Sequence, residues 1–170
     1  MKALIISADG FEDSELLQPC QKLAQAGIAV DIASLQKGRI TGKHGHAVEA
    51  SLAVNEVNAT DYDALILPGG KAPGKLRRDQ TVLELTKQFM TANKPIAAIC
   101  HGPQILLSAG VLQGRAATCY KSVAGELRKA GIDYVDREVV IDGNLITSRQ
   151  PSDLPAFIDA IVQVMNKRVR

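Results

Sequence analysis

The chain has 170 residues and a mass of 18.1 kDa, the size of one domain with a substantial buried core. A hydrophobic fraction of 46% excludes a disordered or fibrous chain. The net charge of +2 and the aromatic content of 4% argue against nucleic acid as a partner, because phosphate binding needs a basic excess and base stacking needs exposed rings.

The N-terminus and the cysteines together predict a cytoplasmic protein. The apolar run of residues 1–6 is too short for a signal-peptide core or a membrane span, and Gly10 follows it closely. Cys20, Cys100 and Cys119 are an odd number without Cys-x-x-Cys spacing, which excludes a disulfide framework and a zinc ribbon. We therefore expect at least one free thiol.

The first fifty residues predict a strand-helix-strand unit. Lys2–Ala8 is apolar without alternation, as in a strand covered on both faces, and Ile28–Ser34 is predicted as the next strand. Asp13–Ala26 has apolar residues at helical spacing, with Gly27 as a terminator. Arg39–Val48 then predicts a hairpin excursion.

The same alternation continues to the C-terminus. The predicted strands are Ala64–Pro68, Pro95–Ile99 and the hairpin Glu138–Ile141 with Leu145–Ser148; the predicted helices are Thr81–Ala92, Pro103–Ala109, Glu126–Ala130 and Ser152–Lys167. A capping box at Thr81 and a cap at Ser152 are expected to start two of these helices. The pattern predicts a single α/β domain over residues 1–170: a three-layer sandwich whose mainly parallel, flavodoxin-like sheet carries helices on both faces.

Cys100 is the strongest candidate for chemistry. Ligands of open α/β sheets bind beyond the carboxyl ends of strands, where this chain has Glu12, Gly69-Gly70 and Cys100-His101. The segment Ala98–Gly102 has the form of a nucleophile elbow with Cys in place of Ser. Such a turn places the sulfur at a helix N-terminus, whose dipole favours a thiolate. The alternative is an inert buried thiol.

A helix terminus alone does not activate this thiol sufficiently. Lowering its pKa by two units requires about 2.7 kcal/mol, and a helix terminus typically supplies less. A further hydrogen-bond donor is therefore expected, and the candidate is Glu12, which would have to be buried and protonated.

Backbone amides are the candidate oxyanion donors. The amide of His101, together with one from Gly69 or Gly70, could bind the oxygen of a tetrahedral intermediate. The alternative for the two glycines is a plain turn after a strand. The side chain of His101 need not face the preceding sulfur, because adjacent residues at a helix start point in different directions.

Two other patterns are weaker. Gly69–Lys75 has the spacing of a phosphate-binding loop, but Leu76 replaces the magnesium-binding Ser or Thr, and Pro73 removes an amide. His44 and His46 lie on either side of Gly45 and could suggest a metal site. No acidic or Cys ligand lies near them in the sequence, so the interpretation as solvated residues of the hairpin is favoured.

With these motifs the chain resembles the PfpI family of intracellular proteases and protein deglycases, within the class I glutamine-amidotransferase-like superfamily. The resemblance covers nearly the whole chain, and its Cys-His-Gly-Pro-Gln run is quite specific. The motifs that carry it are residues 11–13 (Phe-Glu-Asp), 40–45, 67–70 (Leu-Pro-Gly-Gly), 98–104, 139–144 and 147–149.

The resemblance implies roles for particular residues. It makes Cys100 the nucleophile, Glu12 its protonated carboxyl partner, and the amides of Gly70 and His101 the oxyanion donors, with no metal or organic cofactor. It also implies a homodimer or a hexamer. Family proteases add an acidic residue from a neighbouring subunit at the position of Gly74 here; Asp79 is a nearby substitute.

Three functions follow from these residues. The first is a cysteine-dependent hydrolase or lyase of reactive carbonyls, similar to deglycases and glyoxalases, which converts methylglyoxal or its protein and nucleotide adducts to lactate in stress protection. The second is an intracellular cysteine peptidase based on Cys100 and His101. The third is a non-catalytic redox sensor or chaperone in which Cys100 is oxidised.

Overall fold

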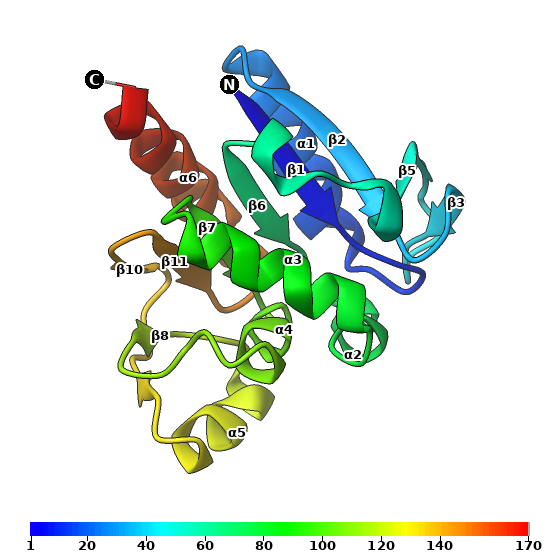
Figure 1. Cartoon of the computed structure of the whole chain (residues 1–170). Coiled ribbons are helices and arrows are strands. Elements are labelled where there is room, and N and C mark those ends of the chain that lie inside the picture. Colours follow the sequence, from blue (N-terminus) through cyan, green and yellow to red (C-terminus); the bar gives the residue numbers. More distant parts are fainter. Residues whose placement is uncertain (170) are drawn as a thin grey trace.

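A central seven-stranded sheet organises the protein, whose computed structural model describes residues 1–169 (Figure 1). The strands lie in the order β10-β11-β7-β6-β1-β2-β5, and all neighbours are parallel except β10 and β11. They are β1 (Lys2–Ile6), β2 (Ala29–Ser34), β5 (Leu52–Ala53), β6 (Ala64–Leu67), β7 (Ile96–Ile99), β10 (Val140–Asp142) and β11 (Leu145–Ser148). The predicted mainly parallel, flavodoxin-like sheet is confirmed.

Helices cover both faces of this sheet (Figure 1). They are α1 (Asp13–Gln25), α2 (Ala72–Leu76), α3 (Gln80–Thr91), α4 (Pro103–Ser108), α5 (Ala124–Lys129) and α6 (Leu154–Val169). α1 packs against α6, whereas α4 packs against both α2 and α3. No helix within residues 1–169 is long and apolar enough to cross a membrane.

Two small strand pairs lie outside the main sheet. The predicted hairpin is formed by β3 (Gly38–Thr41) and β4 (Ala47–Ala50). A parallel pair, β8 (Ala116–Ala117) with β9 (Asp133–Tyr134), was not predicted, because strands of two residues have no readable periodicity.

The starts of two helices differ from the prediction. The Asp79 side chain accepts a hydrogen bond of 3.0 Å from the amide of Val82, so Asp79 caps α3 and the predicted capping box at Thr81 is wrong. Ser152 does not cap α6 either, because Pro151–Asp153 forms a turn of 3₁₀ helix and α6 begins only at Leu154.

The central strands place three loops at one edge of the sheet. β6 and β7 are buried along their whole length, and β1 is buried from Ala3 onward, as expected for parallel strands covered on both faces. Because these strands are parallel neighbours, their carboxyl ends lie side by side. The loop before α1, Gly69-Gly70 and Cys100-His101 meet there.

Candidate active site

Cys100 lies on a sharp turn between β7 and α4. Its φ of 65° falls in the left-handed region, which is uncommon for a residue other than glycine and marks local strain. The Cys100 amide donates to the Ser148 carbonyl at 3.0 Å, and the Gly102 amide donates to the Ile99 carbonyl at 2.8 Å. A Cβ at Gly102 would lie 2.3 Å from the Leu67 carbonyl oxygen, so this turn requires glycine. The predicted elbow geometry is present.

The carboxyl group against the sulfur belongs to Glu15. This side chain on α1 is fully buried, lies beside the Cys100 side chain, and accepts from the Gly69 amide at 2.9 Å through Oε1. Burial is the main cause that raises the pKa of Glu15 to about 8, and the charge of Glu12 adds to it. Glu15 is therefore mainly protonated at neutral pH. Its Oε2 has no protein partner within the described residues.

Glu12, the residue predicted for this role, lies elsewhere in the site. Its carboxylate is 2.8 Å from Lys43 Nζ and 3.4 Å from His44 Nε2, so it faces cations rather than the thiol. The physical reason is helical geometry. Glu12 precedes the first turn of α1, whereas Glu15 lies on the buried face with Pro19 and Leu23 at four-residue spacing. That spacing was a readable signal that Glu15 is buried, although the spacing does not say which group Glu15 meets.

The thiol is held in its protonated form at rest. Burial, and then the nearby Glu15 carboxylate, raise the pKa of Cys100 to about 12, while hydrogen bonds from the Gly70 and His101 amides and the charge of Lys43 act in the opposite direction. The expected stabilisation of a thiolate by the helix N-terminus is thus outweighed by desolvation, because the sulfur is buried. A reaction at this sulfur needs a nearby group that accepts its proton.

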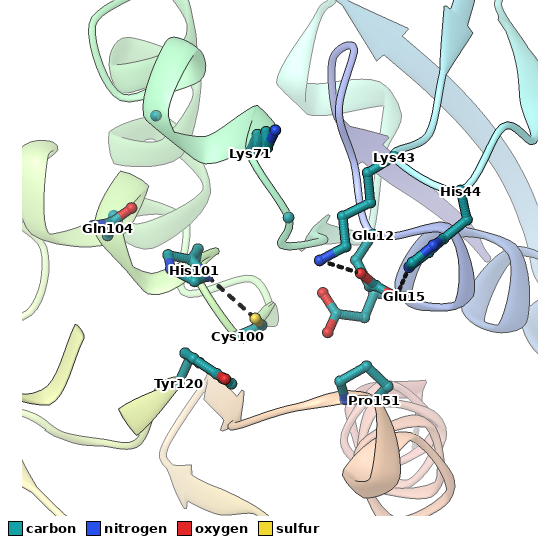
Figure 2. A pocket seen from close by; sticks show the side chains of 12 residues that line it. Glu12, Glu15, Lys43, His44, Lys71, Cys100, His101, Gln104, Tyr120 and Pro151 are labelled. Carbon is teal, nitrogen blue, oxygen red and sulfur yellow. Dashed lines mark hydrogen bonds and ion pairs between the residues drawn. The ribbon is translucent and has the colours of Figure 1, made fainter. Parts of the chain in front are cut away.

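His101 is positioned to accept that proton. Its Nδ1 lies 3.3 Å from the Cys100 sulfur (Figure 2). Its Nε2 lies 3.5 Å from Ser122 Oγ. The imidazole ring stacks on Tyr120 with 5.4 Å between ring centroids. Burial, and then the charge of Lys43, lower the pKa of His101, so the ring is neutral at neutral pH.

Of the three predicted oxyanion donors, two point at the sulfur. The Gly70 and His101 amides both direct hydrogen bonds to Cys100. The Gly69 amide is occupied by Glu15 and does not act in this way. Gly70 has a φ of 85°, and a Cβ there would lie 2.4 Å from the Glu12 nitrogen, so only glycine permits this approach of the two loops.

The turn between β3 and β4 forms the opposite wall, and Asp13 holds it. The buried Asp13 carboxylate accepts from the amides of His44 and His46, each at 3.0 Å, and lies 2.7 Å from His46 Nδ1. Burial alone would raise the pKa of Asp13, but these hydrogen bonds lower it to about 2. Asp13 thereby places Lys43 and His44 beside the site. Within residues 1–169 no three His, Cys, Asp or Glu side chains gather as a metal site.

These parts enclose a cavity of about 670 Å³ (Figure 2). Its lining consists of Glu12, Glu15, Lys43, His44, Gly70, Lys71, Gly74, Cys100, His101, Gln104, Tyr120 and Pro151. Asp79, the suggested substitute for an acid at Gly74, is not part of this lining and is engaged as the cap of α3. Within this chain, His101 has Ser122 rather than a carboxylate at its second nitrogen.

Known proteins resemble this chain over nearly its whole length. Deglycase PfpI of Pyrococcus furiosus is 48% identical over 165 residues, which cover 97% of this chain and 99% of that protein. Two Bacillus subtilis proteins, General stress protein 18 and Putative cysteine protease YraA, are each 43% identical over 92% of this chain and cover 92% and 93% of their own lengths.

Solved structures and a family model agree with these relatives. A crystal structure from Anabaena variabilis, with DJ-1/ThiJ/PfpI-like and ferritin-like domains, matches with a TM-score of 0.95 and 37% identity over 97% of this chain and 48% of that one. Drosophila melanogaster DJ-1beta matches with a TM-score of 0.90 and 32% identity over 96% of this chain and 89% of its own. The model of the DJ-1/PfpI family matches residues 1–164, and the chain therefore belongs to that family.

Proposed function

We propose that this protein is a cysteine-dependent deglycase that releases amines from methylglyoxal adducts and converts the carbonyl fragment to lactate. The observation that carries the proposal is the arrangement around Cys100. One buried sulfur faces a neutral imidazole, a protonated carboxyl group and two backbone amides. The name of the 48% identical relative, Deglycase PfpI, supports the same chemistry.

The first step forms a covalent intermediate. His101 accepts the thiol proton, and the sulfur of Cys100 bonds to the hemiaminal carbon of the adduct while the bond from carbon to nitrogen breaks. Glu15 gives its proton to the departing nitrogen and becomes a carboxylate. The products are a free amine and a hemithioacetal on Cys100. The Gly70 and His101 amides donate to the oxygen on the reacting carbon.

The following steps need no external oxidant or reductant. The Glu15 carboxylate removes the hydrogen of the sulfur-bearing carbon and returns it to the neighbouring carbon through an enediol, so the first carbon is oxidised and the second reduced. The result is a thioester of lactate. Water hydrolyses it, which restores the thiol and releases lactate, and the proton held on His101 returns to Glu15.

The decisive experiment measures lactate and amine release together. Purified protein is incubated with the methylglyoxal adduct of N-acetyllysine or N-acetylarginine beside Cys100→Ala, and Cys20→Ala serves as the matched control. We expect lactate from the wild type and the control but none from Cys100→Ala. If the adduct disappeared equally with all three proteins and no lactate formed, the loss would be trapping by thiols rather than catalysis, which would refute the proposal.

A peptidase is the second candidate, favoured by the 3.3 Å contact of His101 with Cys100 and by the relative named Putative cysteine protease YraA. It predicts casein cleavage that depends on Cys100. It is weakened by Gly74, which lines the cavity without a carboxylate. The redox-sensor alternative is weakened by the raised pKa of Cys100, because oxidation proceeds through the thiolate.

The remaining expectations stay predictions. A homodimer or hexamer is checked by light scattering, and cytoplasmic location by fractionation. The roles of Cys100, His101 and Glu15 are part of our proposal, in which Glu15 replaces Glu12. Glycated protein and glycated nucleotide are both candidate substrates, since both present the same carbon to the sulfur.

A further inference from the structure

The cavity at Cys100 is larger than a small dicarbonyl requires. Its volume of about 670 Å³ lies in the range of pockets that enclose whole cofactors or drug-sized ligands. Cys100 lies at its floor, and the residue has a relative exposure of 7%. A substrate that fills this space carries a substantial group besides the carbonyl fragment, so the lining beyond the sulfur contributes to substrate choice.

The charges of the lining do not cancel. Glu15 is mainly protonated at neutral pH, and the Glu12 carboxylate is paired with Lys43 at 2.8 Å. Lys71 is the remaining lysine of the lining, and it forms no ion pair with any carboxylate of residues 1–169. The ammonium group of Lys71 is therefore not balanced by a carboxylate of the cavity.

Lys71 is anchored close to the reacting atoms. It follows Gly70, whose amide points at the Cys100 sulfur. The Lys71 amide donates to the Gly10 carbonyl at 2.8 Å, and the start of its side chain packs over Gly10, where an added Cβ would lie 3.1 Å from Lys71 Cβ. The backbone is thus held on both sides. Figure 2 shows Lys71 at the start of α2, on the side of the cavity opposite Tyr120 and Pro151, and the residue is part of the cavity lining.

We propose that Lys71 binds an anionic group of the substrate, so that this site prefers small adducts that carry a carboxylate or a phosphate near the glycated atom. This inference rests on the proposed function and specifies its substrate class. Adducts of free amino acids or nucleotides have such a group, whereas an internal side chain of a folded protein has none at a fixed distance. Both anions offer the same oxygen acceptors to an ammonium group.

The first test measures attraction of an anion without any turnover. Iodoacetate and iodoacetamide alkylate the same sulfur and differ in charge, so the ratio of their rates at Cys100, quantified by mass spectrometry, reports the local charge. Lys71→Gln removes the ammonium, and Lys75→Gln removes the next lysine of α2, which lies outside this cavity. We expect Lys71→Gln to lower the ratio about three- to fivefold, as for an exposed ion pair, and Lys75→Gln to leave it unchanged.

Added salt should lower the wild-type ratio towards that of Lys71→Gln. An equal ratio in the wild type and Lys71→Gln would overturn the inference. Because this test needs only a reactive thiol, it stands even if the protein has no deglycase activity.

The second test uses substrates in matched pairs. The carboxylate arm compares methylglyoxal adducts of alanine and alanine amide, and the phosphate arm compares adducts of guanosine monophosphate and guanosine. We expect a higher kcat/KM for the charged member of at least one pair, and a ratio of charged to neutral that falls in Lys71→Gln but not in Lys75→Gln. Equal kcat/KM within both pairs would overturn the substrate preference.

The outcomes separate the two proposals. If all adducts were turned over with the same kcat/KM whatever their charge, the deglycase function would be supported and the anion site refuted. An alkylation ratio that depends on Lys71, without lactate from any adduct, would support the anion site and refute the deglycase function.

Discussion

Glu12 and Glu15 lie three residues apart and line the same cavity, yet the structure places them in different surroundings. Glu15 is fully buried against a thiol and a backbone amide, and burial raises its pKa to about 8. Glu12 lies beside a lysine and a histidine of the β3–β4 turn. The difference shows that the chemistry of a carboxyl group in this site depends on whether it faces the wall with Cys100 or the wall formed by the β3–β4 turn.

The two walls also differ in how they are built. The wall with Cys100 is a strained, buried turn in which added side-chain atoms would collide with the backbone. The wall with Lys43 and His44 is exposed and is held by hydrogen bonds to Asp13. Chemistry is therefore expected on the first wall, and adjustment of substrate binding on the second.

The largest expected effect is at Glu15. Glu15→Gln keeps the size of the side chain but cannot give up and recover a proton, so kcat should fall about 100- to 1,000-fold. Steady-state lactate formation measures this, and circular dichroism checks the fold. If Glu15→Gln retained more than about half of the wild-type kcat, the proton-transfer role would be wrong.

The second prediction concerns stability and pH. The folded-state pKa of Glu15 is raised from 4.5 to about 8, so its contribution to the free energy of unfolding is complete below about pH 4.5 and is lost as the pH rises to about 8. Urea unfolding across this range should show the decline in the wild type, and Glu15→Gln should show a flatter profile. Parallel profiles would contradict a buried, protonated Glu15.

A smaller effect is expected at Asp13. Asp13→Ala removes the acceptor of the His44 and His46 amides, so we expect a loss of about 1.5–3 kcal/mol in the free energy of unfolding. The turn that carries Lys43 then loses its fixed position, so KM should rise more than kcat falls. A fall in kcat alone would assign Asp13 to the chemical step instead. Glu49→Ala, at an exposed position of β4, is the matched control.

The smallest effect is expected at Glu12. Glu12→Gln leaves the groups around the sulfur in place and frees the ammonium of Lys43, so kcat should change less than about threefold. The same variant should increase the preference of the site for iodoacetate over iodoacetamide, because a second positive charge becomes unbalanced. If Glu12→Gln lost as much activity as Glu15→Gln, the assignment of the two carboxyl groups would be reversed.

Several elements of the fold were predictable because their signals are local. Buried strands appear as apolar runs, as in Ala64–Leu67, and glycine closes α1 after Gln25. The caps of α3 and α6 were misplaced because several Asp, Ser and Thr residues compete near each start. The β8–β9 pair was missed because each strand holds two residues.

The sequence by itself determined the alternation of strands and helices and the elbow at Cys100. Apolar runs and small residues around a turn are local signals that span only a few neighbouring positions. Only the tertiary structure decided that Glu15 rather than Glu12 lies beside the thiol. It also decided that the Gly69 amide is bonded to Glu15, whereas the Gly70 amide is directed at the sulfur. Glu15 and Gly69 are 54 residues apart in the chain and come together only when α1 packs beside the ends of β6 and β7. Burial sets the protonation state of Glu15, and burial arises from the packing of distant segments.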